Sequence, residues 1–223
     1  MMKNFAVVFG VFVFIVIFVC SLDVKKGFAQ SFHPKGEISL QIDVPTRNLS
    51  VFVNGTFYKK YPVALGKPST PTPVGKWRII NKYNDWGGGF GTRWMGLNVP
   101  WGIYGIHGTT RPTSIGTYAS NGCIRLHNRN VEELYDLVYI GVPVVIVGDP
   151  LEHFRRLMVG DIGADVQLIQ QRLSKLGFYA GSCNGRFEES TREALETFEE
   201  ARGLPIVGIV GMKEYEELGL TVK

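Results

Sequence analysis

The sequence has few cysteines and little net charge. Three cysteines occur among 223 residues, and one of them, Cys20, lies in an apolar run near the N-terminus, so a disulfide framework is not expected. The formal net charge of +4 is too small to favour nucleic-acid binding. The sequence also lacks a His-Glu-x-x-His motif, the helical ligand pattern of many zinc peptidases, and we expect neither a metal nor a cofactor.

The first 29 residues form a segment of their own. Lys3 precedes an unbroken apolar run over residues 5–20, which is the arrangement of a secretory signal or a membrane anchor. The run is short for a spanning helix, which needs about 20 apolar residues. Gly27 and Ala29 are the small residues that a signal peptidase requires. We therefore expect an exported protein that is either cleaved after Ala29 or tethered to the membrane through residues 5–20.

Residues 37–148 have the pattern of a β-rich domain. Apolar and polar residues alternate over 38–42 and 49–53, and residues 142–147 form the apolar run of a buried strand. The pair Asn54-Gly55 follows the second alternating segment and favours a tight hairpin. The composition, 45% hydrophobic and 20% charged, is that of a folded chain with room for one sizeable domain and a small one.

The pattern changes to helical periodicity towards the C-terminus. A helix is expected with Asn130 as its N-cap and its end before Gly141, and a domain boundary follows between residues 149 and 157. Residues 157–220 then predict a small all-α domain of three helices. These helices are expected to begin at Asp165, at Ser190 or Thr191, and at Lys213.

Two segments of the β-rich domain combine nucleophilic and basic side chains with glycine. A free thiol with a pKa of about 8.5 is only slightly ionised at neutral pH, so a cysteine nucleophile needs an imidazole or a cation beside it. His107 and Arg125 are candidates for these two neighbours of Cys123. Gly122 allows the backbone to turn, so that its own amide and that of Cys123 can point at a developing oxyanion. Single cysteines are usually small buried hydrophobes, but this combination favours acyl transfer.

The motif around these residues resembles the signature of the L,D-transpeptidase catalytic domain, the YkuD-like family. That signature pairs His-Gly with a later Ser-x-Gly-Cys-x-Arg, and this chain has Ile-His-Gly-Thr at 106–109 and Ser-Asn-Gly-Cys-Ile-Arg-Leu at 120–126. Residues 61–67, 70–77 and 95–98 are also similar to recurring segments of the family, so the resemblance covers about residues 38–147. It implies a mainly β catalytic domain, a β-sandwich with one or two helices.

The resemblance also implies a cysteine acyltransferase of bacterial cell wall biogenesis, which forms the cross-links that maintain cell shape. Cys123 is expected to attack the amide between the L- and D-centres of a peptidoglycan tetrapeptide stem, to release the terminal D-alanine and to hold the remainder as a thioester. The amine of a second stem would then take the acyl group. His107 is the expected acid/base, and the backbone carbonyl near Gly108, or Ser120, would orient its imidazole. Arg125 would hold the loop or a substrate carboxylate.

Three further residues bear on this interpretation. Asn121 stands where many relatives carry His, which puts a proton-relay role at that position in doubt, and His127 is a possible substitute. Cys183 lies in the helical domain and is expected to be inert, because a bridge to Cys123 would consume the nucleophile.

The helical domain resembles a peptidoglycan-binding module of three helices. The similar segments include 158–161, 166–179, 184–187, 203–204 and 208–211. The chain departs from the usual text of the module at Asn184, where Asp is common, and at Glu199, where Gln is common. These departures are expected to alter ligand affinity. The implied partner is peptidoglycan, at the cell wall or on the extracellular face of the membrane.

Three alternatives remain open. Water could resolve the thioester, which would make the protein an L,D-carboxypeptidase that trims tetrapeptide stems. A non-catalytic wall-binding protein, in which the β domain only presents the helical module, has no support in the residues because His107 and Cys123 are both present. A zinc peptidase is disfavoured, since no acidic ligand stands beside the candidate ligands His107, Cys123, His127 and His153.

Overall fold

The computed structural model describes residues 36–221. The expected export segment over residues 1–29, with its apolar run 5–20, lies outside the described residues. Within residues 36–221, every helix is too short or too polar to cross a membrane.

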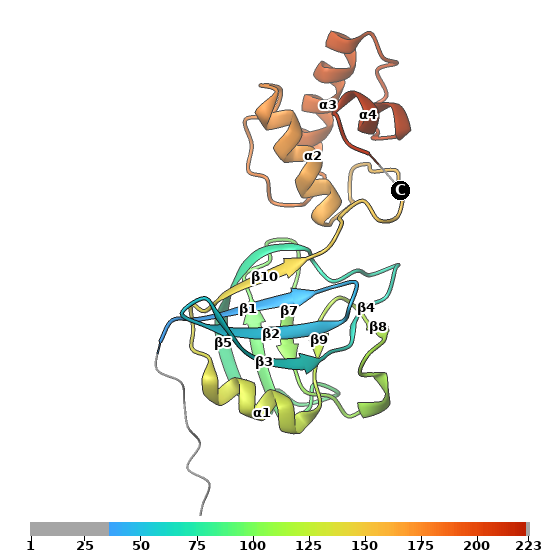
Figure 1. Ribbon diagram of the computed structural model, residues 1–223. Coiled ribbons are helices and arrows are strands. Elements are labelled where there is room, and N and C mark those ends of the chain that lie inside the picture. The colour runs from blue at the N-terminus through green and yellow to red at the C-terminus, as the bar shows by residue number, and fades with distance from the viewer. Residues whose placement is uncertain (1–35, 222–223) are drawn as a thin grey trace, which may run out of the picture. The chain divides into compact units, whose positions relative to one another are not determined.

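The β-rich region forms a curled sheet of eight strands in the order β3-β2-β1-β10-β5-β6-β7-β9 (Figure 1). The strands of this sheet are β1 (Ile38–Asp43), β2 (Asn48–Val53), β3 (Thr56–Pro62), β5 (Gly75–Asn84), β6 (Arg93–Leu97), β7 (Tyr104–His107), β9 (Ile124–Arg125) and β10 (Pro143–Val147). A separate two-stranded sheet joins β4 (Leu65–Gly66) to β8 (Tyr118–Ser120), and a short 3-10 helix covers Pro112–Ser114. The predicted mainly β fold of this region is confirmed.

The alternation of apolar and polar residues in β1 corresponds to alternating burial, and the Asn54-Gly55 pair after β2 forms the expected turn. Ile38, Leu40 and Ile42 are buried on one face of β1 and alternate with more exposed residues. Asn54 and Gly55 join β2 to β3 with φ angles of 51° and 75°, and positive φ at both central residues is the geometry of a tight hairpin turn that matches strand twist. The expected hairpin at this pair is therefore confirmed.

Helix α1 (Asn128–Leu137) packs Val131 and Leu134 into the core of the sheet. It begins two positions before the predicted N-cap Asn130, because the carbonyl oxygen of His127 already accepts hydrogen bonds from the amides of Asn130 and Val131, at 2.9 and 3.0 Å. At its other end, the Lys82 ammonium donates to the carbonyl oxygens of Tyr135 and Val138, each at 2.6 Å. A lysine at this end satisfies carbonyls that lack helical partners and complements the helix dipole.

The helical region has a second buried core. Its helices are α2 (Ala164–Lys175), α3 (Glu189–Arg202) and α4 (Met212–Glu217), as the sequence predicts to within one or two residues. The fully buried side chains that these helices share include Ile169, Leu173, Leu195 and Phe198. Gly203 ends α3 at a φ of 65°, in the left-handed conformation that favours glycine after a helix.

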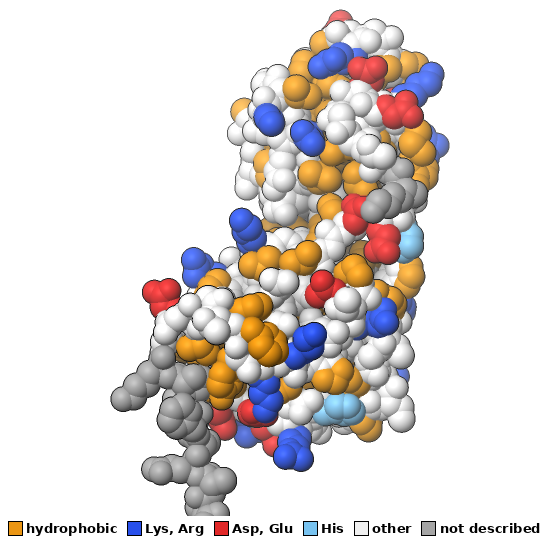
Figure 2. Space-filling model, in the orientation of Figure 1, with side chains coloured by type: hydrophobic (Ala, Val, Ile, Leu, Met, Phe, Trp, Pro, Cys, Tyr) orange, Lys and Arg blue, Asp and Glu red, His pale blue; other side chains and the backbone are white. Residues whose placement is uncertain are grey.

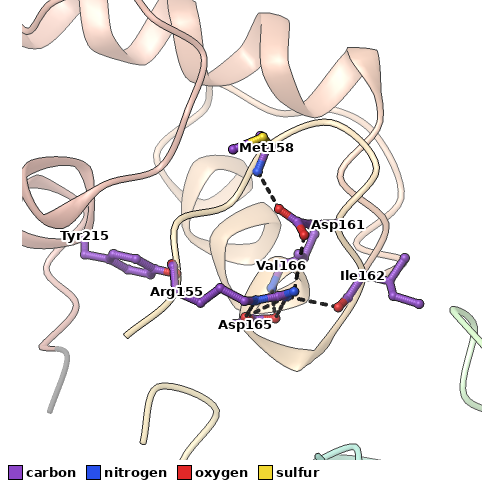
Figure 3. A network of polar contacts seen from close by, with 7 residues as sticks. All are labelled: Arg155, Met158, Asp161, Ile162, Asp165, Val166 and Tyr215. Carbon is purple, nitrogen blue, oxygen red and sulfur yellow. Dashed lines mark hydrogen bonds and ion pairs between the residues drawn. The ribbon is translucent and has the colours of Figure 1, made fainter. Parts of the chain in front are cut away.

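A polar network fixes the start of the helical region (Figure 3). The Arg155 guanidinium donates to both carboxylate oxygens of Asp165, at 2.9 and 3.0 Å, and to the carboxylate of Asp161 at 3.2 Å. Asp161 in turn accepts from the amide of Met158 at 2.8 Å, and the Tyr215 hydroxyl donates to the carbonyl oxygen of Arg155 at 3.0 Å. The chain is thus tied to the helices from Arg155 onward. The domain ranges 37–148 and 157–220 stay a prediction.

The charged side chains do not form a single-sign patch on the face shown in Figure 2. Lysine and arginine side chains are interspersed there with aspartate and glutamate side chains. This mixture accords with the small net charge of +4 and is the arrangement of an ordinary solvated surface.

Candidate active site

His107 and Cys123 lie on or beside neighbouring strands. His107 is the last residue of β7, and Cys123 immediately precedes β9. These strands pair in parallel, with Ile106 opposite Ile124 and His107 opposite Arg125. The loop between them therefore returns the cysteine to the side of the histidine, although many residues separate the two in the sequence.

The His107 ring is enclosed and held in one orientation. Its Nδ1 lies 2.5 Å from the carbonyl oxygen of Gly108, so Nδ1 carries the donated proton and Nε2 is left as the acceptor. The ring stacks on Trp94 at 5.7 Å between centroids and meets the edge of Phe90 at 4.9 Å. Only 2% of the residue is exposed. Burial, with a smaller effect of the Arg125 charge, lowers the pKa of His107 to about 4, so the imidazole is neutral at physiological pH.

The Cys123 thiol is half-buried and also neutral at rest. Burial raises its pKa above the usual value, although a hydrogen bond from the Gly105 backbone and the charge of Arg125 act in the opposite direction. The imidazole at the end of β7 and the thiol just before β9 are therefore both neutral at rest. Such a pair generates a thiolate by proton transfer during the attack, instead of holding one permanently.

Ser120 fixes the loop that carries Cys123. Its fully buried hydroxyl donates to the carbonyl oxygen of Cys123 at 2.6 Å and accepts from the amide of Gly122 at 3.1 Å. Of the two groups expected to orient the imidazole, the Gly108 carbonyl makes that contact, whereas Ser120 holds the loop. The Gly122 amide already has an acceptor, which differs from the expectation that it points at an oxyanion.

Gly122 is required by its conformation and by a close neighbour. Its φ is +105°, which a residue with a side chain rarely adopts. A Cβ at this position would also lie 2.6 Å from the ring of Tyr104, which is half-buried beside the loop. Tyr104 is therefore a site residue that the sequence motif did not indicate. In the sequence, the only indication of this contact was the glycine at position 122, whose lack of a side chain leaves room for another group.

Arg125 is half-buried directly across the strand pair from His107. Its backbone N–H and C=O both pair with Ala64, at 2.9 Å each, which ties β9 to the segment before β4. Within residues 36–221 its guanidinium makes no hydrogen bond or ion pair with the protein. The side chain thus places an uncompensated positive charge next to the thiol and the imidazole.

The remaining candidate residues lie around or away from this pair. Asn121 is exposed two positions before Cys123, and His127 is half-buried at the N-cap of α1, where its side chain makes no hydrogen bond or ring contact with His107 or Cys123 in the described chain. Cys183 is a free, half-buried thiol against the helical core. Among residues 36–221 there is no group of three or more His, Cys, Asp or Glu side chains that could hold a metal ion.

The two departures in the helical region lie in its internal hydrogen bonds. The Asn184 side-chain oxygen accepts from the amide of Arg186 at 2.9 Å and from the side-chain amide of Gln170 at 3.3 Å. Glu199 is fully buried in α3, and its Oε2 accepts from the amides of Val207 and Gly208, at 2.8 and 2.9 Å. Its Oε1 is buried without a partner. The presence of Glu199, where Gln is common, therefore affects the interior of the helical region.

Comparison with known proteins places this geometry in a family. The model of the L,D-transpeptidase catalytic domain, YkuD, matches residues 37–146, and that of a "Putative peptidoglycan binding domain" matches residues 162–218. "Putative L,D-transpeptidase YkuD" of Bacillus subtilis is 42% identical over 107 residues, which are 48% of this chain and 64% of that protein. "Putative L,D-transpeptidase YqjB" of the same organism is 34% identical over 129 residues, 51% of this chain and 73% of that protein. Among solved structures, an L,D-transpeptidase from Mycobacterium smegmatis is 26% identical, with 50% of this chain and 59% of that chain covered and a TM-score of 0.43.

Proposed function

Because the chain belongs to the L,D-transpeptidase catalytic domain family, we propose that it is a transpeptidase of peptidoglycan stem peptides with Cys123 as nucleophile and His107 as base. One observation carries the proposal. A neutral imidazole, with its Nδ1 proton given to the Gly108 carbonyl, lies on the strand beside a half-buried thiol. This arrangement leaves Nε2 able to accept the thiol proton, which is the task of a general base.

The first half of the reaction forms a thioester. The Cys123 sulfur attacks the carbonyl carbon between the L- and D-centres while His107 takes the thiol proton. Negative charge then develops on the carbonyl oxygen. The Cys123 amide is the donor that the loop offers there, because the Gly122 amide is engaged by Ser120. The C–N bond breaks, and the imidazolium gives its proton to the departing amine of D-alanine. Burial makes this imidazolium strongly acidic, which favours that transfer.

The second half returns the enzyme to its resting state. An amine of a second stem attacks the thioester carbonyl, His107 accepts a proton from that amine, and the thiol of Cys123 is regenerated. Arg125, whose charge has no partner in the described residues, attracts a carboxylate of the stem. If water attacks in place of the amine, the product is a trimmed tripeptide and the enzyme acts as an L,D-carboxypeptidase.

Residues outside the catalytic region bring the enzyme to its substrate in this proposal. The helical region matched to the peptidoglycan-binding model holds the glycan or its stems near the site. Residues 1–29 direct export, with cleavage after Ala29 or retention through the apolar run 5–20. The protein then works at the cell wall or on the outer face of the membrane, in wall biogenesis.

The test is mass spectrometry of disaccharide-tetrapeptides incubated with the purified full chain. We expect loss of D-alanine, an acyl-enzyme of the corresponding mass, and cross-linked dimers; tripeptides alone would identify a carboxypeptidase. Cys123→Ala should abolish the acyl-enzyme and all products while binding to isolated wall material survives. Cys183→Ser is the matched control, because it removes the other free thiol of the described residues and should leave activity unchanged. Products from Cys123→Ala at the wild-type rate would refute the cysteine mechanism.

A further inference from the structure

An aromatic row crosses the sheet and ends at His107. In the strand register, Tyr83 of β5 lies opposite Trp94 of β6, and Trp94 lies opposite His107 of β7, so the three side chains share one face. Trp86, from the loop after β5, stacks on Trp94 at 5.2 Å between centroids and an interplanar angle of 25°. It also contacts Tyr83, with centroids 4.7 Å apart. The catalytic ring is thus one end of a continuous aromatic stack.

The outer part of this stack is open to solvent. Tyr83 and Trp86 are each 45% exposed, whereas Trp94 is 2% exposed. Scattered exposed aromatics need no explanation, but these two rings touch each other and continue to the catalytic histidine. We call Tyr83 and Trp86 the aromatic ridge. Asp85, next to Trp86 in the loop, has an exposed polar side chain.

The loop that carries Trp86 is anchored to the catalytic segment. The amide of Asp85 donates to the carbonyl oxygen of Thr92 at 3.1 Å, which closes the loop at its base. Gly91 has a φ of +67°, and a Cβ there would collide with the side chain of Asn128 and the amide of Thr109. The ridge therefore keeps a fixed place relative to His107, as a substrate subsite requires.

We propose that the aromatic ridge binds the amino-sugar ring that carries the donor stem peptide. The proposal rests on the proposed function, since that function supplies a stem attached to a sugar. One face of a pyranose ring presents C–H groups that pack flat on aromatic rings, while its hydroxyl and acetamido groups lie at the edge and need polar partners. The exposed carboxylate of Asp85, next to Trp86 in the chain, is such a partner; one of its oxygens also accepts from the amide of Gly87 at 3.3 Å.

The reach of the substrate agrees with this placement. Three amino-acid residues separate the scissile carbonyl from the sugar, and three extended residues span roughly 10 Å. Two ring-to-ring steps, of 5.7 and 5.2 Å, lead from His107 through Trp94 to Trp86. A stem whose scissile carbonyl lies at the His107 ring is therefore about long enough to place its sugar on the ridge.

The experiment compares two donors on the full chain: a free tetrapeptide and the same tetrapeptide attached to its disaccharide. The wild type should have the lower KM for the disaccharide donor. Trp86→Ala should raise that KM roughly three- to tenfold, the size of a lost aromatic contact, and should raise the KM for the free peptide much less. Trp86→Phe should keep most of the preference. Tyr58→Ala is the matched control, because it removes a 40% exposed tyrosine from the edge strand β3, which three strands separate from β5.

The outcomes separate this proposal from the proposed function. Equal KM values for both donors in the wild type, or an equal loss on both donors in Trp86→Ala, would overturn the sugar site while leaving the transpeptidase intact. If the wild type releases D-alanine from neither donor, the proposed function fails. Calorimetric titration with the peptide-free disaccharide then decides the sugar site alone: binding that Trp86→Ala weakens and Tyr58→Ala does not supports it, and equal binding by all three proteins overturns it.

Discussion

Glu199 offers a direct measurement of what a buried carboxylate costs the helical region. Its Oε2 accepts two backbone hydrogen bonds, but its Oε1 is buried without a partner, and burial raises the pKa of Glu199 above the ordinary value of 4.5. A raised folded-state pKa favours the protonated form. The stability that Glu199 contributes is therefore fully present below pH 4.5 and is lost as the pH rises through the folded-state pKa.

Glu199→Gln removes the charge and keeps the shape and the accepting oxygen. The amide nitrogen of the glutamine would take the partnerless position of Oε1, so the gain comes from removing a buried negative charge. We expect the variant to be more stable than the wild type at pH 7.5 by about 1–3 kcal/mol. In a cooperative unit of this small size, 1 kcal/mol corresponds to a shift of roughly 4–8 °C in Tm. Near pH 4 the difference should shrink, because the wild-type carboxyl is then neutral as well.

The assay is thermal unfolding of the full chain from pH 4 to pH 8, with hydrogen exchange of the α3 amides to identify the transition of the helical region. Glu196→Gln is the matched control on the same helix. Its partly exposed carboxylate pairs with Arg192, so the control should lose at most about 0.5 kcal/mol and show no gain at high pH. A Glu199→Gln variant that is less stable than the wild type at pH 7.5, or equally stable at all pH values, would refute this reasoning.

Two further predictions concern the catalytic loop. Burial lowers the pKa of His107 from the ordinary 6.5 to about 4, so the imidazole can act as a base at any pH above about 4. The rate constant kcat/KM for acylation should therefore fall on the acid side with an apparent pKa near 4. An apparent pKa near 6.5 would contradict the assignment of His107 as the base. Ser120→Ala should leave the Cys123 carbonyl and the Gly122 amide without their partner, at a cost of about 1–3 kcal/mol, and should slow acylation measured by stopped-flow with a tetrapeptide donor. Ser114→Ala, which removes a loop hydroxyl bonded to the Arg111 carbonyl, is its control, and equal acylation rates in the two variants would speak against a positioning role for Ser120.

The sequence predicted the parts of the fold that depend on local patterns. Some features are determined by a few neighbouring residues and can be predicted without a structure. They are the alternation in β1, the turn at Asn54-Gly55 and the apolar faces of α2 and α3. The sequence did not predict the pairing of β7 with β9, because a long loop separates these two strands. The resemblance to a family supplied the His107–Cys123 pair in its place.

The features that sequence reasoning missed depend on register and burial. The aromatic row that ends at His107 depends on a β-bulge between Ile79 and Asn81, because this bulge sets the register in which Tyr83 lies opposite Trp94. No pattern of residues in the sequence predicts that bulge. The contact of Ser120 with its own loop, in place of the imidazole, depends on the fold of four consecutive residues. Glu199 was identified as a departure, but only its burial shows that the departure affects the interior.

The neutral state of the Cys123 thiol has a consequence for the lifetime of the protein. Peroxides, disulfides and alkylating agents react with thiolates much faster than with thiols. A cysteine whose pKa is raised by burial therefore resists oxidation to sulfenic acid and mixed-disulfide formation while no substrate is present. Under the proposed function, the same burial that delays ionisation until a stem peptide binds would also preserve the sulfur between turnovers, without a reducing partner to restore it.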